Sequence, residues 1–565
     1  MGPAFIEITV IVCLAAILSY LFRILKQPAI LAYILTGILI GFLGFFDVSN
    51  HDLLNTLAQL GITFLLFTLG LEIKIKNFAS ISKVVFVVAS VQMLFSFLAG
   101  YIASLLFGFS VTSAIYIGIA LMFSSTVIVV KMISERKEFH SLYGKIAVGI
   151  LLIQDLLAIG ILVFLSAFNP QFLSAKPIFV FSQILLKGFL LFAAVFLLQK
   201  YVFPKVTEKL ARSTETLFLA SIAWVFGLSA LVSSTGFSVE IGGFLAGIAL
   251  ANSIVNYQII ARAKILQDFF IVLFFVLLGA QMVFVTSLGG FLKIFIPALT
   301  LSFLALVIKP FIVMIIMGVM GYKKRTSFLT GVSLAQISEF SLITVFLGQR
   351  LGHVSNEVIS IVTFSAIITF TLSTYLLSGN KDLYKAIHRY LSFLELVPIK
   401  REDEIESPDG LSELKNHVVL IGGDQMGQSI LNALEDIEVE VVVVDFDPEI
   451  LKNLEIKKVH RLYGDISDLD IQERAKLDSA KLVISTNPDL EDNLLLLKEL
   501  KHENRRAKVV VMAFDTTEAK NLYKAGADYV ILPHLAGGRQ IAKLISENHL
   551  DGIENLKRKD LEYIK

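Results

Sequence analysis

The sequence predicts a polytopic α-helical membrane domain followed by a C-terminal α/β domain with a parallel sheet. The 565 residues are 55% hydrophobic with a mean hydropathy of +0.75, far above a soluble domain. Long apolar runs fill residues 1–379, and short valine-rich runs separated by turns follow a charged stretch. We therefore expect a membrane domain at 1–379, a linker at 380–412, an α/β domain at 413–540 and a C-terminal tail at 541–565.

Charge and cysteine content exclude several other classes of protein. The net charge of +1 gives no indication of nucleic-acid binding. The single cysteine, Cys13, cannot form an intrachain disulfide, and no Cys/His cluster has the spacing of a metal site. The N-terminal apolar run lacks a basic segment and a cleavage pattern, so we expect a retained helix.

Thirteen apolar runs have the length of membrane spans. They cover residues 4–22, 29–46, 55–73, 83–107, 112–133, 145–168, 178–201, 214–235, 239–255, 267–285, 291–320, 327–349 and 356–378. Lysine and arginine concentrate in alternate loops, which predicts an external N-terminus and a cytoplasmic C-terminal domain at the plasma membrane or bacterial inner membrane.

Thirteen spans divide into six, a linking span and six, so the two sets of six have opposite topology. Inverted repeats of this kind are common in transporters, whose sites lie where discontinuous helices meet. Spans 5 and 12 correspond in this pairing, and each has a polar interruption, at residues 123–127 and 333–341. Single Ser and Thr residues often only hydrogen-bond between packed helices, but two matched interruptions predict an ion site.

Asp155 lies in the middle of residues 146–165, a run with no other charge. At about 1.5 Å per residue its carboxylate is near the midplane of a hydrocarbon core roughly 30 Å thick. Such an acid costs on the order of 2.5 to 3.5 kcal/mol on insertion scales. A buried ion pair or hydrogen bond between helices is one explanation, and transport of a proton or cation is the one we favour.

Lys309 and Glu339 are two further charges at membrane depth. Pro310 bends the helix beside Lys309 and leaves a carbonyl free. A lysine at this depth needs a carboxylate or carbonyls, and Asp155 is the candidate partner. The pair is either structural, or a cation that binds Asp155 displaces Lys309. For Glu339 we favour a structural or gating role.

These residues resemble the monovalent cation:proton antiporters, and in particular the Kef-type potassium/proton branch. The resemblance rests on Gln154 with Asp155 and on short motifs at residues 70–72, 124–126, 244–247 and 336–340. It implies an elevator-type fold with crossed broken helices in which Asp155 exchanges cation for proton. One acid beside Gln154 fits electroneutral potassium exchange, with sodium as the alternative. The implied ion-site residues are Asp155, Gln154, Ser125, Thr126, Lys309 and Glu339.

The C-terminal domain begins with a Rossmann unit. Residues 417–421 and 440–445 are strand patterns, and residues 422–427 form a glycine turn that opens a helix, an arrangement typical of phosphate binding. Asp445 ends the second strand, where a carboxylate accepts hydrogen bonds from a ribose and disfavours NADP(H). Asp424 replaces the second glycine of the fingerprint and would crowd or repel a pyrophosphate.

The domain resembles the TrkA-N/RCK domains that regulate potassium conductance, which implies a regulatory NAD(H) or AMP ligand and pairing into a homodimer. The candidate nucleotide contacts are Gly422, Gly423, Gln425, Met426, Gly427, Asp445, Phe446, Gly464 and Asp465. A fold that binds nothing and only dimerises is the alternative. The family also implies a glutathione-type regulator or an ancillary subunit.

The predicted function is a nucleotide-gated secondary antiporter, and not an enzyme, that exports potassium in exchange for protons. A potassium channel would need a carbonyl-lined filter of the Thr-x-Gly-Tyr-Gly type, which the sequence lacks. A membrane oxidoreductase would need a partner cofactor site and a catalytic constellation, for which we see no pattern.

Overall fold

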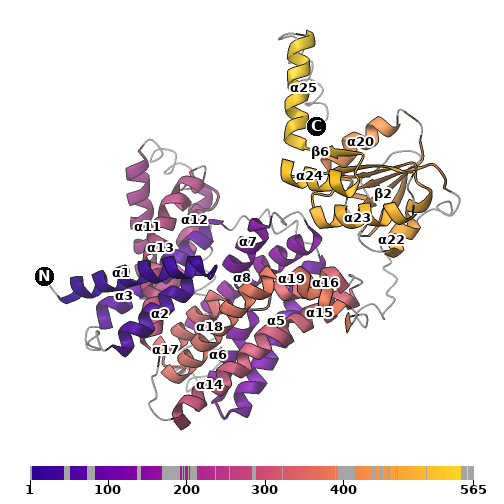
Figure 1. Cartoon of the computed structure of the whole chain (residues 1–565). Coiled ribbons are helices and arrows are strands. Elements are labelled where there is room, and N and C mark those ends of the chain that lie inside the picture. The colour runs from indigo at the N-terminus through magenta and orange to yellow at the C-terminus, as the bar shows by residue number, and fades with distance from the viewer. Residues whose placement is uncertain are drawn as a thin grey trace. The chain divides into compact units, whose positions relative to one another are not determined.

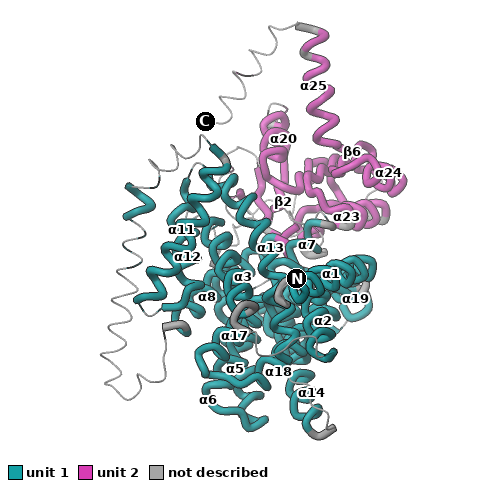
Figure 2. The backbone as a smooth tube through the Cα atoms, turned by 90° about the vertical axis from the view of Figure 1, so that its left-hand side faces the viewer, with its two compact units in different colours: residues 1–136, 145–397 teal, residues 137–144, 398–565 magenta. Residues whose placement is uncertain are grey.

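A computed structural model describes residues 3–43, 51–72, 83–136, 141–167, 213–282, 288–391 and 414–548, apart from gaps of at most four residues. Some positions between 191 and 203, and residue 557, are described as well. The chain divides into two compact units, residues 1–136 with 145–397 and residues 137–144 with 398–565 (Figure 2).

One group of helices in the membrane unit, bundle A, joins an N-terminal and a central part of the chain (Figure 1). It contains α1 (Pro3–Ile24), α2 (Ala29–Phe42), α3 (His51–Glu72), α11 (Thr214–Ser234), α12 (Val239–Leu250) and α13 (Asn256–Ala280). The α13 helix begins eleven residues before the predicted span at 267. The apolar run starts later than the helix, because the first turns of the helix carry Arg262 and Lys264.

Glycines let the helices of bundle A approach at backbone distance. A Cβ added to Gly247 of α12 would lie 2.2 Å from the Phe67 carbonyl of α3, and one on Gly70 would lie 2.5 Å from the Phe244 carbonyl. Membrane helices lack a hydrophobic drive to associate, so small residues that allow close packing stabilise their contacts. Two of the motifs that carry the family resemblance, around Gly70 and Gly247, therefore pack against each other.

A second group, bundle B, holds the interrupted helices (Figure 1). It contains α5 (Lys83–Leu106), α6 (Val111–Met122), α7 (Thr126–Glu135), α8 (Leu142–Ala167), α14 (Leu288–Phe303), α15 (Lys309–Val319), α16 (Lys324–Ser333), α17 (Glu339–Arg350) and α18 (Asn356–Ser378). A π-helical turn at Leu304–Ile308 joins α14 to α15, in keeping with the missing donor of Pro310. The exit segment forms α19 (Asn380–Ile387).

The helices confirm the predicted polytopic membrane domain. Among the described residues, eight helices are long and apolar enough to cross a membrane. Helix also occupies the expected spans at 29–46, 55–73, 239–255 and 327–349, where it is shorter, less apolar or interrupted. The expected span at 178–201 lies largely outside the described residues.

The C-terminal unit contains the predicted parallel sheet. Its six strands are β1 (Val418–Ile421), β2 (Val441–Asp445), β3 (Val459–Tyr463), β4 (Leu482–Ser485), β5 (Lys508–Met512) and β6 (Tyr529–Ile531). They are ordered β3-β2-β1-β4-β5-β6, so the order reverses between β1 and β4, where Rossmann folds bind ligands. Val418 pairs with Val441 on one side and with Leu482 on the other.

Helices connect the strands of this sheet. They are α20 (Gln425–Glu435), α22 (Leu469–Arg474), α23 (Leu490–Glu503) and α24 (Thr516–Ala525), and α25 (Pro533–Asn548) follows the last strand. Two clusters of buried aliphatic side chains lie in this unit, one including Val419 and Val442 and the other Val418 and Val441. Because neighbouring residues of a strand point to opposite faces, the β1 and β2 valines contribute to both clusters. The α25 helix runs across residue 540, where a C-terminal tail was expected.

Candidate functional site

Two interrupted helices meet at their breaks in bundle B. The chain is extended at residues 123–125, between α6 and α7, and is not helical at 334–338, between α16 and α17. Ser124 Oγ donates to the Leu334 carbonyl at 3.0 Å, and Ser341 Oγ donates to the Ala120 carbonyl at 2.5 Å. Both polar interruptions of the sequence are therefore breaks, and they contact each other.

Asp155 faces one of these breaks from α8. The residue is 9% exposed, and its Oδ2 accepts a hydrogen bond from Thr126 Oγ1 at 2.9 Å. Thr126 is the first residue of α7, so the carboxylate is next to a helix N-terminus, whose free N–H groups and partial positive charge favour an anion.

Gln154 contacts a different point of the same break. Its Oε1 accepts from the Ser124 backbone N–H at 2.9 Å, and its Nε2 donates to Gln92 Oε1 of α5 at 2.5 Å. Gln154 and Asp155, which are neighbours on α8, thus contact different parts of the break. The amide holds the backbone of the break, and the carboxylate faces Thr126.

Glu339 joins the N-terminal ends of both half-helices. Its Oε1 accepts from Ser125 Oγ at 3.0 Å, and its Oε2 accepts from Ser338 Oγ at 3.3 Å. Ser125 is the N-cap of α7, and Ser338 is the N-cap of α17. The structure therefore places Ser125 on Glu339 and Thr126 on Asp155.

Lys309 does not pair with Asp155, so that part of the sequence prediction was wrong. The residue is 1% exposed, and Nζ donates to the Phe123 carbonyl at 2.7 Å and to the Gln336 carbonyl at 2.8 Å. Both carbonyls lie in the breaks, where they have lost the partners of a continuous helix. These two acceptors satisfy the ammonium without a carboxylate.

The two fixed charges match the helix dipoles of the breaks. Lys309 lies at the C-terminal ends of α6 and α16, where partial negative charge collects, and Glu339 lies at the N-terminal ends of α7 and α17. Broken helices that meet at the membrane midplane form ion sites in this way. Asp155 is a further carboxylate beside an already neutralised crossing.

Two glutamines complete the crossing. Neither was among the predicted ion-site residues, although Gln336 opens the motif at residues 336–340. Gln92 Nε2 donates to Ser96 Oγ at 2.9 Å and to the Met122 carbonyl at 3.2 Å, and Gln336 Nε2 donates to the Ser333 carbonyl at 3.2 Å. Gln92 has a sequence signal, because it is an amide within the apolar run of α5. An amide in such a run needs partners from another helix.

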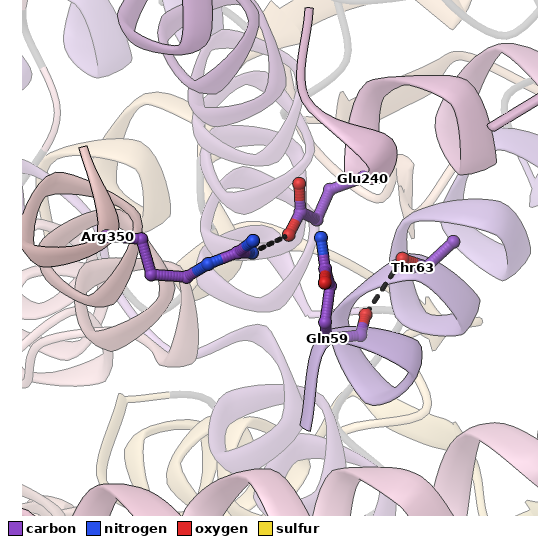
Figure 3. Close-up of polar contacts among 4 residues, drawn as sticks. All are labelled: Gln59, Thr63, Glu240 and Arg350. Carbon is purple, nitrogen blue, oxygen red and sulfur yellow. Dashed lines mark hydrogen bonds and ion pairs between the residues drawn. The ribbon is translucent and has the colours of Figure 1, made fainter. Parts of the chain in front are cut away.

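Apolar side chains fill the seam between bundles A and B beyond Asp155. They leave a cavity of about 20 Å³, little more than one water requires, lined among others by Ile62, Leu66, Ile159, Leu162, Phe244 and Phe346. At the end predicted to be external, Arg350 Nη1 of α17 pairs with Glu240 Oε1 of α12 at 2.7 Å. Figure 3 shows Glu240 between Arg350 and Gln59 of α3. This ion pair joins the two bundles.

The glycine turn of the C-terminal unit is held by two carboxylates. Asp445 Oδ2 accepts from the Gly423 N–H at 2.7 Å, and Asp424 Oδ1 accepts from the Gly427 N–H at 3.2 Å. Gly422 has a φ of +91°, and a Cβ on Gly427 would lie 2.0 Å from the Gly422 carbonyl, so both positions need glycine.

The remaining candidate nucleotide contacts are placed as follows. Gln425 and Met426 open α20, and Gly464 follows β3. Phe446 and Asp465 lie outside the described residues.

Two family models match the chain, one for each unit. A model described as sodium/hydrogen exchanger, transmembrane, matches residues 10–378, and a model described as TrkA-N domain matches residues 418–533. The chain belongs to the sodium/hydrogen exchanger family. This exchanger is a multi-pass membrane protein and a cation/proton antiporter with a C-terminal TrkA-N domain, and its relatives include Kef-type antiporters.

Three similar proteins span most of the exchanger. The iron transporter MagA of Paramagnetospirillum magneticum is 28% identical over 70% of this chain and 90% of its own length. The putative cation/proton antiporter YbaL of Escherichia coli is 26% identical over 94% and 95%. The glutathione-regulated potassium-efflux system protein KefC of Escherichia coli is 26% identical over 88% and 78%.

Replacing Lys309 tests its role at the breaks. We expect Lys309→Met to lower the unfolding temperature of the purified exchanger. Two buried carbonyls lose their hydrogen-bond donor, and each unsatisfied carbonyl costs about 1 to 3 kcal/mol of folding free energy. Thermal unfolding in detergent measures the change, and Lys293→Met on the exposed face of α14 is the control. Asp155→Asn should leave the unfolding temperature nearly unchanged. An equal loss in Asp155→Asn would mean that Lys309 depends on Asp155 after all.

Breaking the Glu240–Arg350 ion pair tests whether it closes the seam. In a Cys13→Ser background we expect Arg350→Gln to speed the labelling of Leu347→Cys by a membrane-impermeant maleimide. Glu240 then has no cation, and the two bundles separate more often at this end. Arg350→Lys keeps the charge and is the control, and the exchanged pair Glu240→Arg with Arg350→Glu should restore slow labelling. Labelling at the same rate in Arg350→Gln would show that the apolar seam closes without the ion pair.

Proposed function

We propose that the protein exports potassium in exchange for protons, one for one, and that Asp155 binds either ion. The observation that carries the proposal is a buried carboxylate at a helix break, with the Thr126 hydroxyl 2.9 Å away and Lys309 engaged elsewhere. Thr126 donates to the charged carboxylate. When a proton or cation is bound instead, the hydroxyl oxygen is available to accept a bond or ligate.

The neighbours of Asp155 support an electroneutral exchange. Gln154 carries no charge, Glu339 is held by two serine hydroxyls, and Lys309 is held by two carbonyls. One carboxylate that takes one proton or one monovalent cation presents the same net charge with either ligand. The roles of Ser125, Glu339 and Lys309 in this proposal are therefore to stabilise the crossing.

The choice of potassium follows the relatives. KefC and the putative antiporter KefB of Alkalimonas amylolytica are both named for potassium efflux. Sodium with the same mechanism is the second candidate, favoured by the description of the matching family model. Alternating basic loops support a cytoplasmic C-terminal domain and a plasma or bacterial inner membrane location.

Regulation through the C-terminal domain is part of the proposal. Asp445 lies at the end of β2, where a carboxylate suits a ribose, and the glycine turn leads into the N-terminus of α20. The N-terminus of α20 fits a pyrophosphate less well, because the Gly427 N–H already donates to the Asp424 carboxylate. The NAD or AMP ligand is therefore proposed with its ribose on Asp445. The homodimer and a glutathione-type or ancillary regulator extend the proposal by family resemblance.

A polar contact in the membrane unit supports communication with the linker. Arg136, at the C-terminal end of α7, donates to the Asn380 side-chain oxygen at 2.6 Å and to the Ser378 carbonyl. Ser378 ends α18, and Asn380 begins α19, which leads to the linker. The other end of α7 carries Thr126, so one short helix connects the start of the exit segment to the ion site.

Asp155→Asn tests the transport proposal. Reconstituted into vesicles, this variant should lose potassium-dependent proton movement by at least about 100-fold, since the amide neither binds a proton at neutral pH nor attracts a cation. Asp268→Asn, on the exposed side of α13, is the matched control and should transport normally. Parallel assays with sodium, and with the membrane potential clamped, report the ion and the charge moved. Exchange at the wild-type rate in Asp155→Asn would remove Asp155 from the mechanism.

Asp424→Gly tests the nucleotide proposal. Calorimetry on the purified full-length protein should show binding of NADH or AMP and much weaker binding of NADPH. In Asp424→Gly the affinity for NADH should rise about tenfold, because a carboxylate leaves the pyrophosphate position. The gain for AMP should be smaller. If neither form of the protein binds an adenine nucleotide, a dimerisation role is left for the domain.

A further inference from the structure

We propose that Gln92 is a positioning residue for transport. With Gln154 it forms a bridge of two side-chain amides across the break between α6 and α7, and this bridge holds the backbone that presents Thr126 to Asp155. The proposal rests on the proposed function of Asp155. It assigns Gln92 a role in cation binding that acts through the backbone of the break.

The bridge begins and ends on backbone groups of the same break. The Ser124 N–H donates to Gln154 Oε1 at 2.9 Å, and Gln154 Nε2 donates to Gln92 Oε1 at 2.5 Å. Gln92 Nε2 then donates to the Met122 carbonyl at 3.2 Å. Both glutamines are 0% exposed, so the bridge is shielded from water and lipid.

The direction of the bridge is set by its two ends. A backbone N–H can only donate and a carbonyl can only accept, so Ser124 requires the oxygen of Gln154 and Met122 requires the nitrogen of Gln92. The oxygen of Gln92 is then left to accept from Gln154. Side-chain amides are otherwise ambiguous in orientation, but here each one has a single orientation that satisfies the whole series.

The bridge replaces hydrogen bonds that the interrupted helix cannot make. Phe123 has extended backbone angles, φ −88° and ψ 150°, so the chain between Met122 and Ser124 does not form helical bonds. An unpaired backbone group in the membrane costs several kcal/mol. The amides satisfy one donor and one acceptor and tie the break to α5 and α8. Thr126 is two residues beyond Ser124, so a shift of Ser124 moves the hydroxyl that contacts Asp155.

The bridge also has to remain uncharged. A carboxylate at position 92 would accept from Gln154, but it could not donate to the Met122 carbonyl. An apolar side chain at position 92 would leave the Gln154 nitrogen and the Met122 carbonyl without these partners. Glutamine meets both requirements, because its side chain offers a donor and an acceptor at the same depth.

The test compares Gln92→Met, which keeps the side-chain volume, with Gln92→Glu and with the control Ser96→Ala. Potassium-dependent proton flux in proteoliposomes gives KM and the maximal rate. We expect both Gln92 variants to raise KM for the cation roughly tenfold. At metal sites, removal of a residue that hydrogen-bonds to a ligand weakens metal binding by a similar factor. Ser96→Ala should keep the wild-type KM. Ser96 Oγ accepts a hydrogen bond from Gln92 but is not part of the bridge between the Ser124 and Met122 backbone groups.

A double-mutant cycle separates the bridge from simple packing. If the amides act as one unit, Gln92→Met combined with Gln154→Met should raise KM no further than Gln154→Met alone. Additive effects, or a wild-type KM in Gln92→Met and Gln92→Glu, would overturn the proposal. If one variant does not fold, the other supplies the KM. Failure of the proposed function is a separate result, since it appears as normal exchange in Asp155→Asn with Gln92 intact.

Discussion

The structure of the membrane unit depends on one constraint, that interrupted helices expose backbone groups where no water can satisfy them. Three of the polar residues at the crossing satisfy such backbone groups. Lys309 donates to the carbonyls of Phe123 and Gln336. Gln154 accepts from the Ser124 N–H, and the Ser124 hydroxyl donates to the Leu334 carbonyl. The polar composition of the site is thus first a requirement of folding, and the same groups provide the electrostatic surroundings for an ion.

Asp155 differs from the other charged groups in how it is held. Lys309 is fixed by two carbonyls and Glu339 by two serine hydroxyls, whereas Asp155 accepts one described side-chain hydrogen bond, from Thr126. A carboxylate that exchanges ligands must be bound loosely enough to release each of them. In the proposed mechanism Lys309 and Glu339 neutralise the helix ends, so the charge of Asp155 remains for the transported ion.

In the C-terminal unit, too, side chains of the same chain satisfy backbone groups. Its glycine turn has N–H groups that a bound phosphate would satisfy in a typical Rossmann domain. Here Asp424 and Asp445 satisfy two of them with carboxylates of the same chain. The nucleotide proposed for this domain would have to compete with these contacts. Such competition suits a sensor that responds to concentration more than a tightly bound cofactor.

The sequence by itself determined the two-unit architecture, the two helix breaks, the strands and the position of Asp155. These features are local, because hydropathy over a span, glycine turns and one charge in an apolar run each concern neighbouring residues. The partner of Lys309, the bridge through Gln92 and the Glu240–Arg350 ion pair were decided by the tertiary structure. Each joins residues far apart in the chain, and an apolar run does not show which helices become neighbours or which carbonyls a break leaves free.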